Sequence, residues 1–134
     1  MDRVLVTGAT SGIGRAIAVT LQKVGFAVSA TGRNEAALAA LAAEAPGIEC
    51  LCLDLSDRDA VVAALGDRDV DVLVNNAGVM PRPGSFDTMD FAAIEQTIAV
   101  NLNSVLFLTH LLLPQMRRRQ SGHLIFTGSS AAHA

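Results

Sequence analysis

The sequence of 134 residues contains no tyrosine and no tryptophan, and Lys23 is its single lysine. General acid catalysis needs a proton donor held within hydrogen-bond reach, so a phenol is excluded as that donor within this sequence. The two cysteines, Cys50 and Cys52, lie two positions apart in an apolar run, which places them on one face of a strand. This spacing suits neither a disulfide nor a complete zinc site, so we expect two buried thiols and no metal.

The net charge is also small. The formal net charge is −3, which leaves no basic footprint for nucleic acid. The one basic cluster, at 117–119, follows a long helical segment, where cations favour the negative end of the helix dipole. No uninterrupted apolar run reaches the roughly 18 residues of a bilayer span, and the chain starts on a strand-like run rather than a signal peptide. We expect a cytoplasmic protein that binds neither membrane nor nucleic acid.

Hydrophobic residues make up 51% of the chain, which indicates a well-filled interior. Apolar runs predict strands at 3–7, 26–31, 48–53, 71–74 and 123–128. Helical spacing predicts helices at 14–24, 34–45 and 56–66, and a long helical region at 89–116 that is broken or bent near Asn101. This alternation predicts an α/β fold in one domain, 1–134. We expect a doubly wound parallel sheet of the Rossmann type, with strand order 3-2-1-4-5 and no strand after the fifth.

The segment VTGATSGIG, at 6–14, places three glycines directly after the first predicted strand. Gly8, Gly12 and Gly14 would let the chain turn tightly and let a pyrophosphate approach the backbone amides at the start of a helix. A tight turn without a ligand is the alternative, because a glycine-rich loop alone is weak support for binding.

Other candidate residues follow the second, third and fourth predicted strands, where open α/β sheets bind ligands. Thr31-Gly32-Arg33 lacks the acid of an NAD site and offers a guanidinium, which favours the 2′-phosphate of NADP over NAD. A carboxylate at Asp54 would accept from an adenine amino group or else cap the next helix. Residues 75–78, NNAG, offer amides and a close backbone approach.

Taken together, these motifs resemble the short-chain dehydrogenase/reductase family, and the resemblance covers the whole chain. Residues 7–14 look like the family's cofactor turn, Asp54-Leu55 like its adenine site, and NNAG like its strand-four signature. Val100-Asn101-Leu102 looks like the helical asparagine motif. GHLIFTGSS, at 122–130, is similar to the strand that delivers the active-site serine.

The resemblance implies a role for each matching residue. Ser129 would hydrogen-bond the substrate carbonyl oxygen, and Asn101 would bend its helix so that a freed carbonyl holds a water of the proton relay. Ser130 takes the place of Ser129 if the match of residues 122–130 to the family's strand shifts by one position. The alternative role for Ser129 is a helix cap, and the alternative for Asn101 is a tolerated amide in the middle of a helix. The residues implied to bind the cofactor are Gly8, Thr10, Ser11, Gly12, Ile13, Gly14, Arg33, Asp54, Leu55, Asn76, Ala77 and Gly78.

The family's Tyr-x-x-x-Lys motif is missing, and its expected location lies beyond Ala134. His133 is a conceivable substitute donor that we expect to be a surface residue. We therefore interpret the chain as the front part of a longer reductase, inactive by itself, that uses NADP(H) on a carbonyl or a secondary alcohol. A non-catalytic nucleotide-binding regulator is the alternative, and a different adenosine ligand, such as a methyl donor, is disfavoured by Arg33 and NNAG. Apolar residues all round 102–113 predict a homo-oligomer through that helix.

Overall fold

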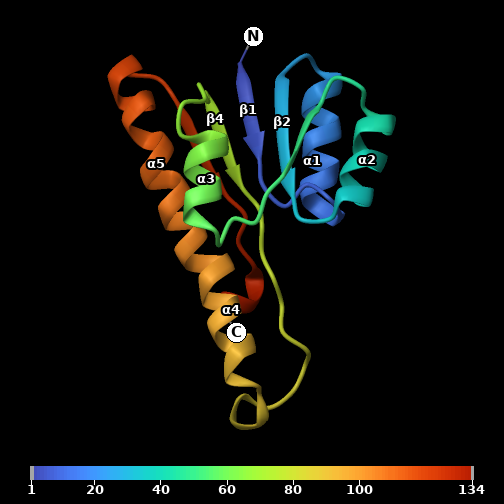
Figure 1. Cartoon of the computed structure of the whole chain (residues 1–134), viewed down its shortest axis with the longest axis vertical. Helices are drawn as coiled ribbons and strands as arrows, with labels where there is room; N and C mark the ends of the chain where they lie inside the picture. Colours follow the sequence, from blue (N-terminus) through green and yellow to red (C-terminus); the bar gives the residue numbers. More distant parts are fainter. Residues whose placement is uncertain (1, 134) are drawn as a thin grey trace.

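The computed structural model describes residues 2–133, which contain a parallel sheet of five strands. The strands are β1 (Arg3–Val6), β2 (Ala27–Gly32), β3 (Glu49–Cys52), β4 (Val72–Asn75) and β5 (His123–Phe126). Their order is β3-β2-β1-β4-β5, so the predicted fold class and strand order are confirmed (Figure 1). The strand bounds differ from the prediction by one or two residues at some ends, which is the usual precision of such boundaries.

Helices connect the strands and cover both faces of the sheet. They are α1 (Gly12–Lys23), α2 (Glu35–Glu44), α3 (Arg58–Leu65), α4 (Phe91–Ile98) and α5 (Ser104–Arg119), with short 3₁₀ helices at Phe86–Thr88 and Ser130–His133. Val4 and Val6 of β1 pack into a core with α1 and α2, whereas Leu5 packs into a second core with α3 and α5. Because both faces are covered, β1 is apolar at successive positions rather than at alternate ones.

The first turns of α2 and α3 are capped by asparagine and aspartate side chains, and the cap of α3 differs from the prediction. Asn34, the first residue of the predicted helix at 34–45, is the N-cap of α2, and its side chain accepts from the Ala37 amide at 2.9 Å. We expected α3 to begin at Ser56, but Asp57 is the cap and accepts from the Ala60 amide at 3.1 Å. The hydroxyl of Ser56 donates to Asp54 at 2.7 Å instead. A serine next to two aspartates has competing partners, which the sequence alone does not rank.

The two cysteines do not behave alike. Cys50 is half-buried against the first core, but Cys52 is exposed, so the expectation of two buried thiols is wrong for Cys52. The reason is that β3 is the outermost strand on its side of the sheet. Both thiols are free, as expected.

The region 91–119 is one continuous helical segment, because α4 and α5 are joined by a π-helical turn at Ala99–Asn103. The predicted irregularity near Asn101 is therefore confirmed, in the form of a π turn. Such turns leave backbone carbonyls without their usual partner. Here the Ser104 amide donates to the Ala99 carbonyl, five residues back, and the Ser104 hydroxyl donates to the Val100 carbonyl.

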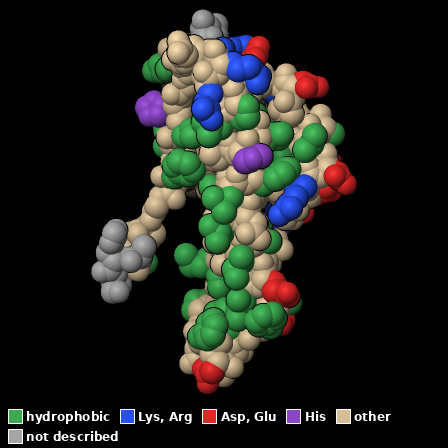
Figure 2. All heavy atoms as spheres, turned by 90° about the vertical axis from the view of Figure 1, so that its left-hand side faces the viewer, with side chains coloured by type: hydrophobic (Ala, Val, Ile, Leu, Met, Phe, Trp, Pro, Cys, Tyr) green, Lys and Arg blue, Asp and Glu red, His purple; other side chains and the backbone are tan. Residues whose placement is uncertain are grey.

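This segment of 29 residues is long and apolar enough to cross a membrane by length and composition, with a mean hydropathy of 1.5 in its most apolar window. The expectation that no segment reaches this length is thus wrong, because it counted only uninterrupted apolar residues. The same pattern occurs in core helices of soluble proteins, and Leu108 and Leu112 are buried against the sheet. Its other face exposes Ile98, Leu102 and Leu106. Apolar side chains are frequent along that side of the molecule, among polar and charged ones (Figure 2).

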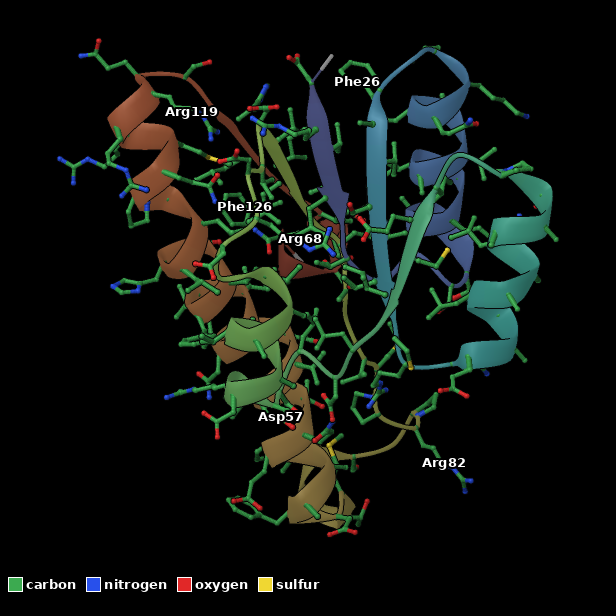
Figure 3. The ribbon with its side chains drawn as sticks, turned by 45° about the horizontal axis from the view of Figure 1, so that its top comes forward. Phe26, Asp57, Arg68, Arg82, Arg119 and Phe126 are labelled. Carbon is green, nitrogen blue, oxygen red and sulfur yellow. The ribbon has the colours of Figure 1, made fainter. Side chains whose placement is uncertain are left out.

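A charged cluster ties the amino ends of β1 and β4 together. The Asp71 carboxylate accepts from the backbone amide of Arg3 at 2.8 Å and from its guanidinium at 2.9 Å. These bonds hold the pKa of Asp71 down at about 2. Arg119, at the end of α5, joins the cluster by donating to the Val70 carbonyl at 2.7 Å (Figure 3). Arg117, Arg118 and Arg119 all lie in the last turn of α5, as the helix-dipole argument predicted, and Arg119 in addition contacts the segment before β4.

Candidate functional site

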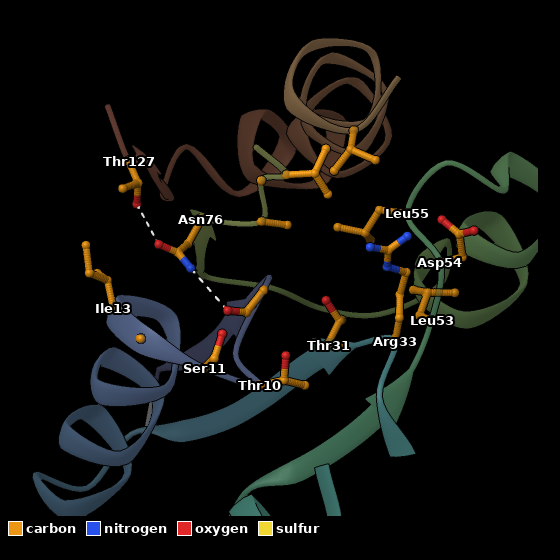
Figure 4. Close-up of a pocket in the computed structure, with 17 residues that line it drawn as sticks. Thr10, Ser11, Ile13, Thr31, Arg33, Leu53, Asp54, Leu55, Asn76 and Thr127 are labelled. Carbon is orange, nitrogen blue, oxygen red and sulfur yellow. Dashed lines mark hydrogen bonds between the residues drawn. The ribbon is translucent and has the colours of Figure 1, made fainter. Parts of the chain in front are cut away.

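A pocket of about 520 Å³ lies at the carboxyl ends of the strands, where open α/β sheets bind ligands (Figure 4). Every residue predicted to bind the cofactor lines it except Gly14, which lies beneath the turn. The lining residues are Gly8, Thr10, Ser11, Gly12, Ile13, Thr31, Gly32, Arg33, Leu53, Asp54, Leu55, Asn76, Ala77, Gly78, Val79, Val100 and Thr127.

The three glycines of the turn after β1 are required for different reasons. Gly8 has φ +64°, and a Cβ there would lie 2.6 Å from the Ala77 Cα. Gly12 has φ +55° with open space around it, so conformation alone disfavours a side chain. Gly14 has an ordinary φ, but a Cβ would collide with the Gly8 carbonyl oxygen and the Asn76 amide nitrogen. The turn therefore packs tightly against the residues that follow β4, and Gly12 leaves part of its pocket side without a side chain.

The start of α1 differs from the other capped helices. Asn34, Asp57 and Asp90 each accept a bond from an amide in the first turn of the helix that follows them. Ser11, the N-cap of α1, makes no such bond. The first amides of α1 face the pocket without a side-chain acceptor, and with the positive end of the helix dipole they can bind an anion.

Asn76 connects the carboxyl ends of three strands. Its amide nitrogen donates to the carbonyls of Thr7 and Gly8 at 3.3 and 3.2 Å. Its amide oxygen accepts from the Thr127 hydroxyl at 3.1 Å, just after β5. The Thr7 hydroxyl accepts from the Asn76 and Ala77 amides at 3.0 Å each. The NNAG segment thus holds the glycine turn in place and forms one wall of the pocket.

The opposite wall comes from the ends of β2 and β3. Arg33 is exposed and makes no ion pair with any residue of 2–133, and its side chain extends beside Leu55 (Figure 4). Asp54 accepts from the Ser56 hydroxyl and amide, which lower the pKa of its carboxyl below the ordinary value. Because Asp57 caps α3, the alternative that Asp54 caps that helix is wrong. An unpaired guanidinium beside an ionised carboxylate provides a cation and an acceptor at one end of the pocket.

Asn101 lies in the π turn, outside the pocket. Its amide oxygen accepts from the Val79 amide at 2.7 Å, and its amide nitrogen donates to the Val79 carbonyl at 2.8 Å. The side chain thus fixes the segment after β4 against the long helix. The sequence did not indicate this pairing, because 22 residues separate the two partners.

Ser129 is exposed, and its hydroxyl accepts from the Ala131 amide at 3.2 Å, at the start of the last 3₁₀ helix. This is the capping geometry that the sequence left open as an alternative. Ser130 is also exposed. The structure does not bring Ser129 or Asn101 to the pocket surface, and the side chain of His133 lies outside the described residues.

Six lining residues were missed by the sequence analysis. Most adjoin a predicted motif, and the rule that ligands bind at strand ends would have included them. Thr31 carried a further signal, since it is a polar residue inside an apolar strand. The missed residues are Thr31, Gly32, Leu53, Val79, Val100 and Thr127.

Comparison with known proteins places this pocket in context. The chain matches the short chain dehydrogenase family over residues 2–134. It is 47% identical over 116 residues to D-erythrulose reductase of Gallus gallus, covering 85% of this chain and 46% of the relative. It is 39% identical over 132 residues to L-xylulose reductase of Bos taurus, covering 97% of this chain and 53% of the relative.

The same comparison extends to three dimensions. A short-chain dehydrogenase of Sphingobium yanoikuyae in complex with NADPH superposes with a TM-score of 0.92 at 30% identity, covering 100% of this chain and 56% of that one. The chain spans about half the length of the curated relatives it matches. Since the family match covers nearly every residue and the fold agrees, the chain belongs to the short-chain dehydrogenase/reductase family of oxidoreductases.

Proposed function

We propose that this chain is the dinucleotide-binding part of an NADP(H)-dependent reductase that transfers hydride between nicotinamide and a carbonyl or secondary alcohol. The observation that carries the proposal is the pocket itself, in which the uncapped start of α1 and the unpaired Arg33 face the same space. These are two anion-binding features at separate points of one pocket. A dinucleotide with a pyrophosphate and a 2′-phosphate has anionic groups to match both.

The residues present fit such a cofactor. The bare glycine turn lets a pyrophosphate approach the backbone, and the pocket volume of about 520 Å³ lies within the range of about 300–1,000 Å³ for ligand sites. No acid occupies the end of β2 or the two positions after it, Arg33 and Asn34, where an NAD enzyme would bind the ribose 2′-hydroxyl. Several structural relatives were solved with NADP⁺ or NADPH, which supports the choice of cofactor.

Each part of the pocket would then have a task. The amides around Ser11 and Ile13 would bind the pyrophosphate, Asp54 the adenine amino group, and the NNAG backbone the adjoining ribose. Bound NADPH would supply the hydride. Ser129 would stabilise negative charge on the substrate oxygen once its hydroxyl leaves the Ala131 amide. Asn101 would hold the segment after β4 beside the nicotinamide end of the cofactor. We also propose that a backbone carbonyl of the π turn binds a water of the proton relay.

This proposal assigns the proton donor to no residue, because the sequence contains no tyrosine. The second candidate is a nucleotide-binding module without catalysis, which would use the same pocket and need no proton donor. The D-erythrulose and L-xylulose reductases act, by their names, on small sugar ketones, which supports a carbonyl substrate for the first candidate. Binding of NADPH without its oxidation, in the presence of a panel of small ketones, would favour the second.

The remaining expectations belong to the same proposal. We propose a single cytoplasmic domain that contacts neither nucleic acid nor membrane, as part of a longer reductase. The apolar face with Ile98, Leu102 and Leu106 supports a homo-oligomer, because a helix packed only on its own sheet needs one apolar stripe.

Replacing Arg33 with aspartate tests the choice of cofactor. The change removes a charge-assisted bidentate partner of the 2′-phosphate and adds repulsion, so the dissociation constant for NADPH should rise roughly 10- to 100-fold while that for NADH falls or stays constant. Nicotinamide fluorescence measures both, because the protein has no tryptophan. Arg82→Asp, the same charge change at an exposed arginine outside the pocket, is the control. An unchanged NADPH-to-NADH affinity ratio would show that Arg33 is not the selector.

A further inference from the structure

Ser104 makes two hydrogen bonds across the π turn that joins α4 to α5. It is 4% exposed and is the first residue of α5. Its amide donates to the Ala99 carbonyl, five residues back, and not to the Val100 carbonyl, four residues back, as in an α-helix. Its hydroxyl donates to the Val100 carbonyl instead. The hydroxyl therefore replaces a bond that the π turn removes.

The bond between Ser104 and Val100 is buried at both ends, because Val100 is 7% exposed. A buried carbonyl without a donor costs more free energy than the net gain of one hydrogen bond. A π turn can shift along a helix, because each step exchanges one bond to the fifth residue back for one to the fourth. A hydroxyl at 104 therefore favours the position of the turn at which its own amide leaves the Val100 carbonyl.

The helix α5 is anchored to the sheet, and α4 is not. Leu108 and Leu112 are buried in the core beneath α5, whereas no residue of α4 is buried. If the π turn moves toward α4, each residue that it passes changes direction around the helix axis by about 100°, because an α-helix has about 3.6 residues per turn. Packing of α4 does not oppose this shift, so the bonds at the turn itself must hold it in place.

Asn101, inside the π turn, is the residue whose direction matters most. Its side chain bonds the amide and the carbonyl of Val79, and it lies against Gly78, where a Cβ would be 3.4 Å from the Asn101 amide oxygen. Gly78, Val79 and Val100 line the pocket. We propose that Ser104 is a positioning residue, whose hydroxyl fixes the π turn and thereby holds Asn101 on Val79 at the wall of the pocket. Its effect on the cofactor rests on the proposed function, whereas its effect on Val79 does not.

Amide hydrogen exchange at Val79 tests the structural part of this inference. In Ser104→Ala the Val100 carbonyl loses its donor, so the π turn shifts more often and the Val79 amide leaves its side-chain acceptor. The Val79 amide should then exchange about 10-fold faster or more relative to the Ala77 amide, which donates to the Thr7 hydroxyl at 3.0 Å. This ratio separates positioning from a general loss of stability, because global unfolding would accelerate the exchange of both amides.

Binding of NADPH tests the functional part. Ser104→Ala should raise the dissociation constant about 3- to 10-fold by nicotinamide fluorescence, because a wall of the pocket loses its fixed place. Ser104→Thr keeps a hydroxyl that can bond the carbonyl four residues back, so it should restore the exchange ratio and the affinity to within about twofold of the wild type. Thr97→Ala is the matched control and should change neither, since the Thr97 hydroxyl donates to the Ala93 carbonyl, four residues back, within the regular α4.

The outcomes distinguish the two proposals. Wild-type protein that binds no NADPH overturns the proposed function, while the exchange ratio still decides whether Ser104 holds Asn101 on Val79. An exchange ratio in Ser104→Ala equal to that of the wild type overturns the inference. So does an equal increase in Thr97→Ala, which would mean that any such hydroxyl bond in the helix has the same effect. A changed exchange ratio with unchanged NADPH affinity overturns the role of Ser104 at the pocket wall.

Discussion

Asn76 provides the sharpest test of how the pocket is held together. Asn76→Asp keeps the shape of the side chain but replaces its amide nitrogen, which donates to the Thr7 and Gly8 carbonyls, with an acceptor. Two hydrogen bonds of about 0.5–1.5 kcal/mol each are lost, and a carboxylate then faces two carbonyl oxygens. Because the unfavourable contact of the carboxylate with two carbonyl oxygens adds to the lost bonds, we expect a loss of about 2–4 kcal/mol in the free energy of unfolding at pH 7, nearer the lower figure since the bonds are long, at 3.3 and 3.2 Å.

The pH dependence of this variant carries a second prediction. Burial beside two carbonyl oxygens should raise the pKa of the new carboxyl in the folded state above its unfolded value. The folded variant then binds more protons than the unfolded one, so its stability rises as the pH falls from 7 to 5. The protonated carboxyl can donate one of the two lost bonds, which restores part of the loss.

Urea unfolding followed by circular dichroism at pH 7 and pH 5 measures both effects, since the protein lacks tryptophan and tyrosine. With an m-value of about 1–3 kcal/mol per molar urea, the midpoint at pH 7 should fall by about 1–2 M. Asn103→Asp, the same change at an exposed asparagine, should stay within about 0.5 kcal/mol of the wild type. Equal midpoints for Asn76→Asp and Asn103→Asp would refute the reasoning that this amide holds the turn.

Two further predictions concern the turn and the opposite end of the sheet. Gly12→Ala should cost about 1–2 kcal/mol, the value for a left-handed alanine. Gly14→Ala should cost about 3 kcal/mol or more and abolish NADPH binding, because its Cβ meets backbone atoms that cannot move aside. Urea unfolding and nicotinamide fluorescence compare the two, and equal losses would contradict the steric account of Gly14. The Arg3 side chain is the main cause that lowers the pKa of Asp71 to about 2 in the folded protein. Asp71 therefore contributes stability that is present above its ordinary pKa and is lost as the pH falls from about 4 to about 2. Because the Asp71 side chain is 25% exposed, we expect Asp71→Asn to remove about 1 kcal/mol of this pH-dependent stability. An acid unfolding curve that the substitution leaves unchanged would contradict the role of the Asp71–Arg3 pair.

Much of the pocket could be predicted because ligand sites in this fold occur where strands end. Gly8, Arg33 and Asp54 follow successive strands, and a parallel sheet brings such positions to one edge. Asn101 and Ser129 show the limit of the same reasoning. Both match motifs, yet their side chains contact Val79 and the Ala131 amide in this structure, and motif position alone does not say which neighbour a polar group binds.

The sequence by itself determined the alternation of strands and helices and the need for glycine after β1. Both depend on local properties, the period of apolar residues and the φ angle of single residues. Only the tertiary structure decided that Asn76 joins three strands, that Arg119 reaches Val70, that Cys52 is exposed and that the Thr31 hydroxyl is buried without a partner among the described residues. Those facts depend on which strands become neighbours and which strand is outermost, and the packing of distant segments sets both.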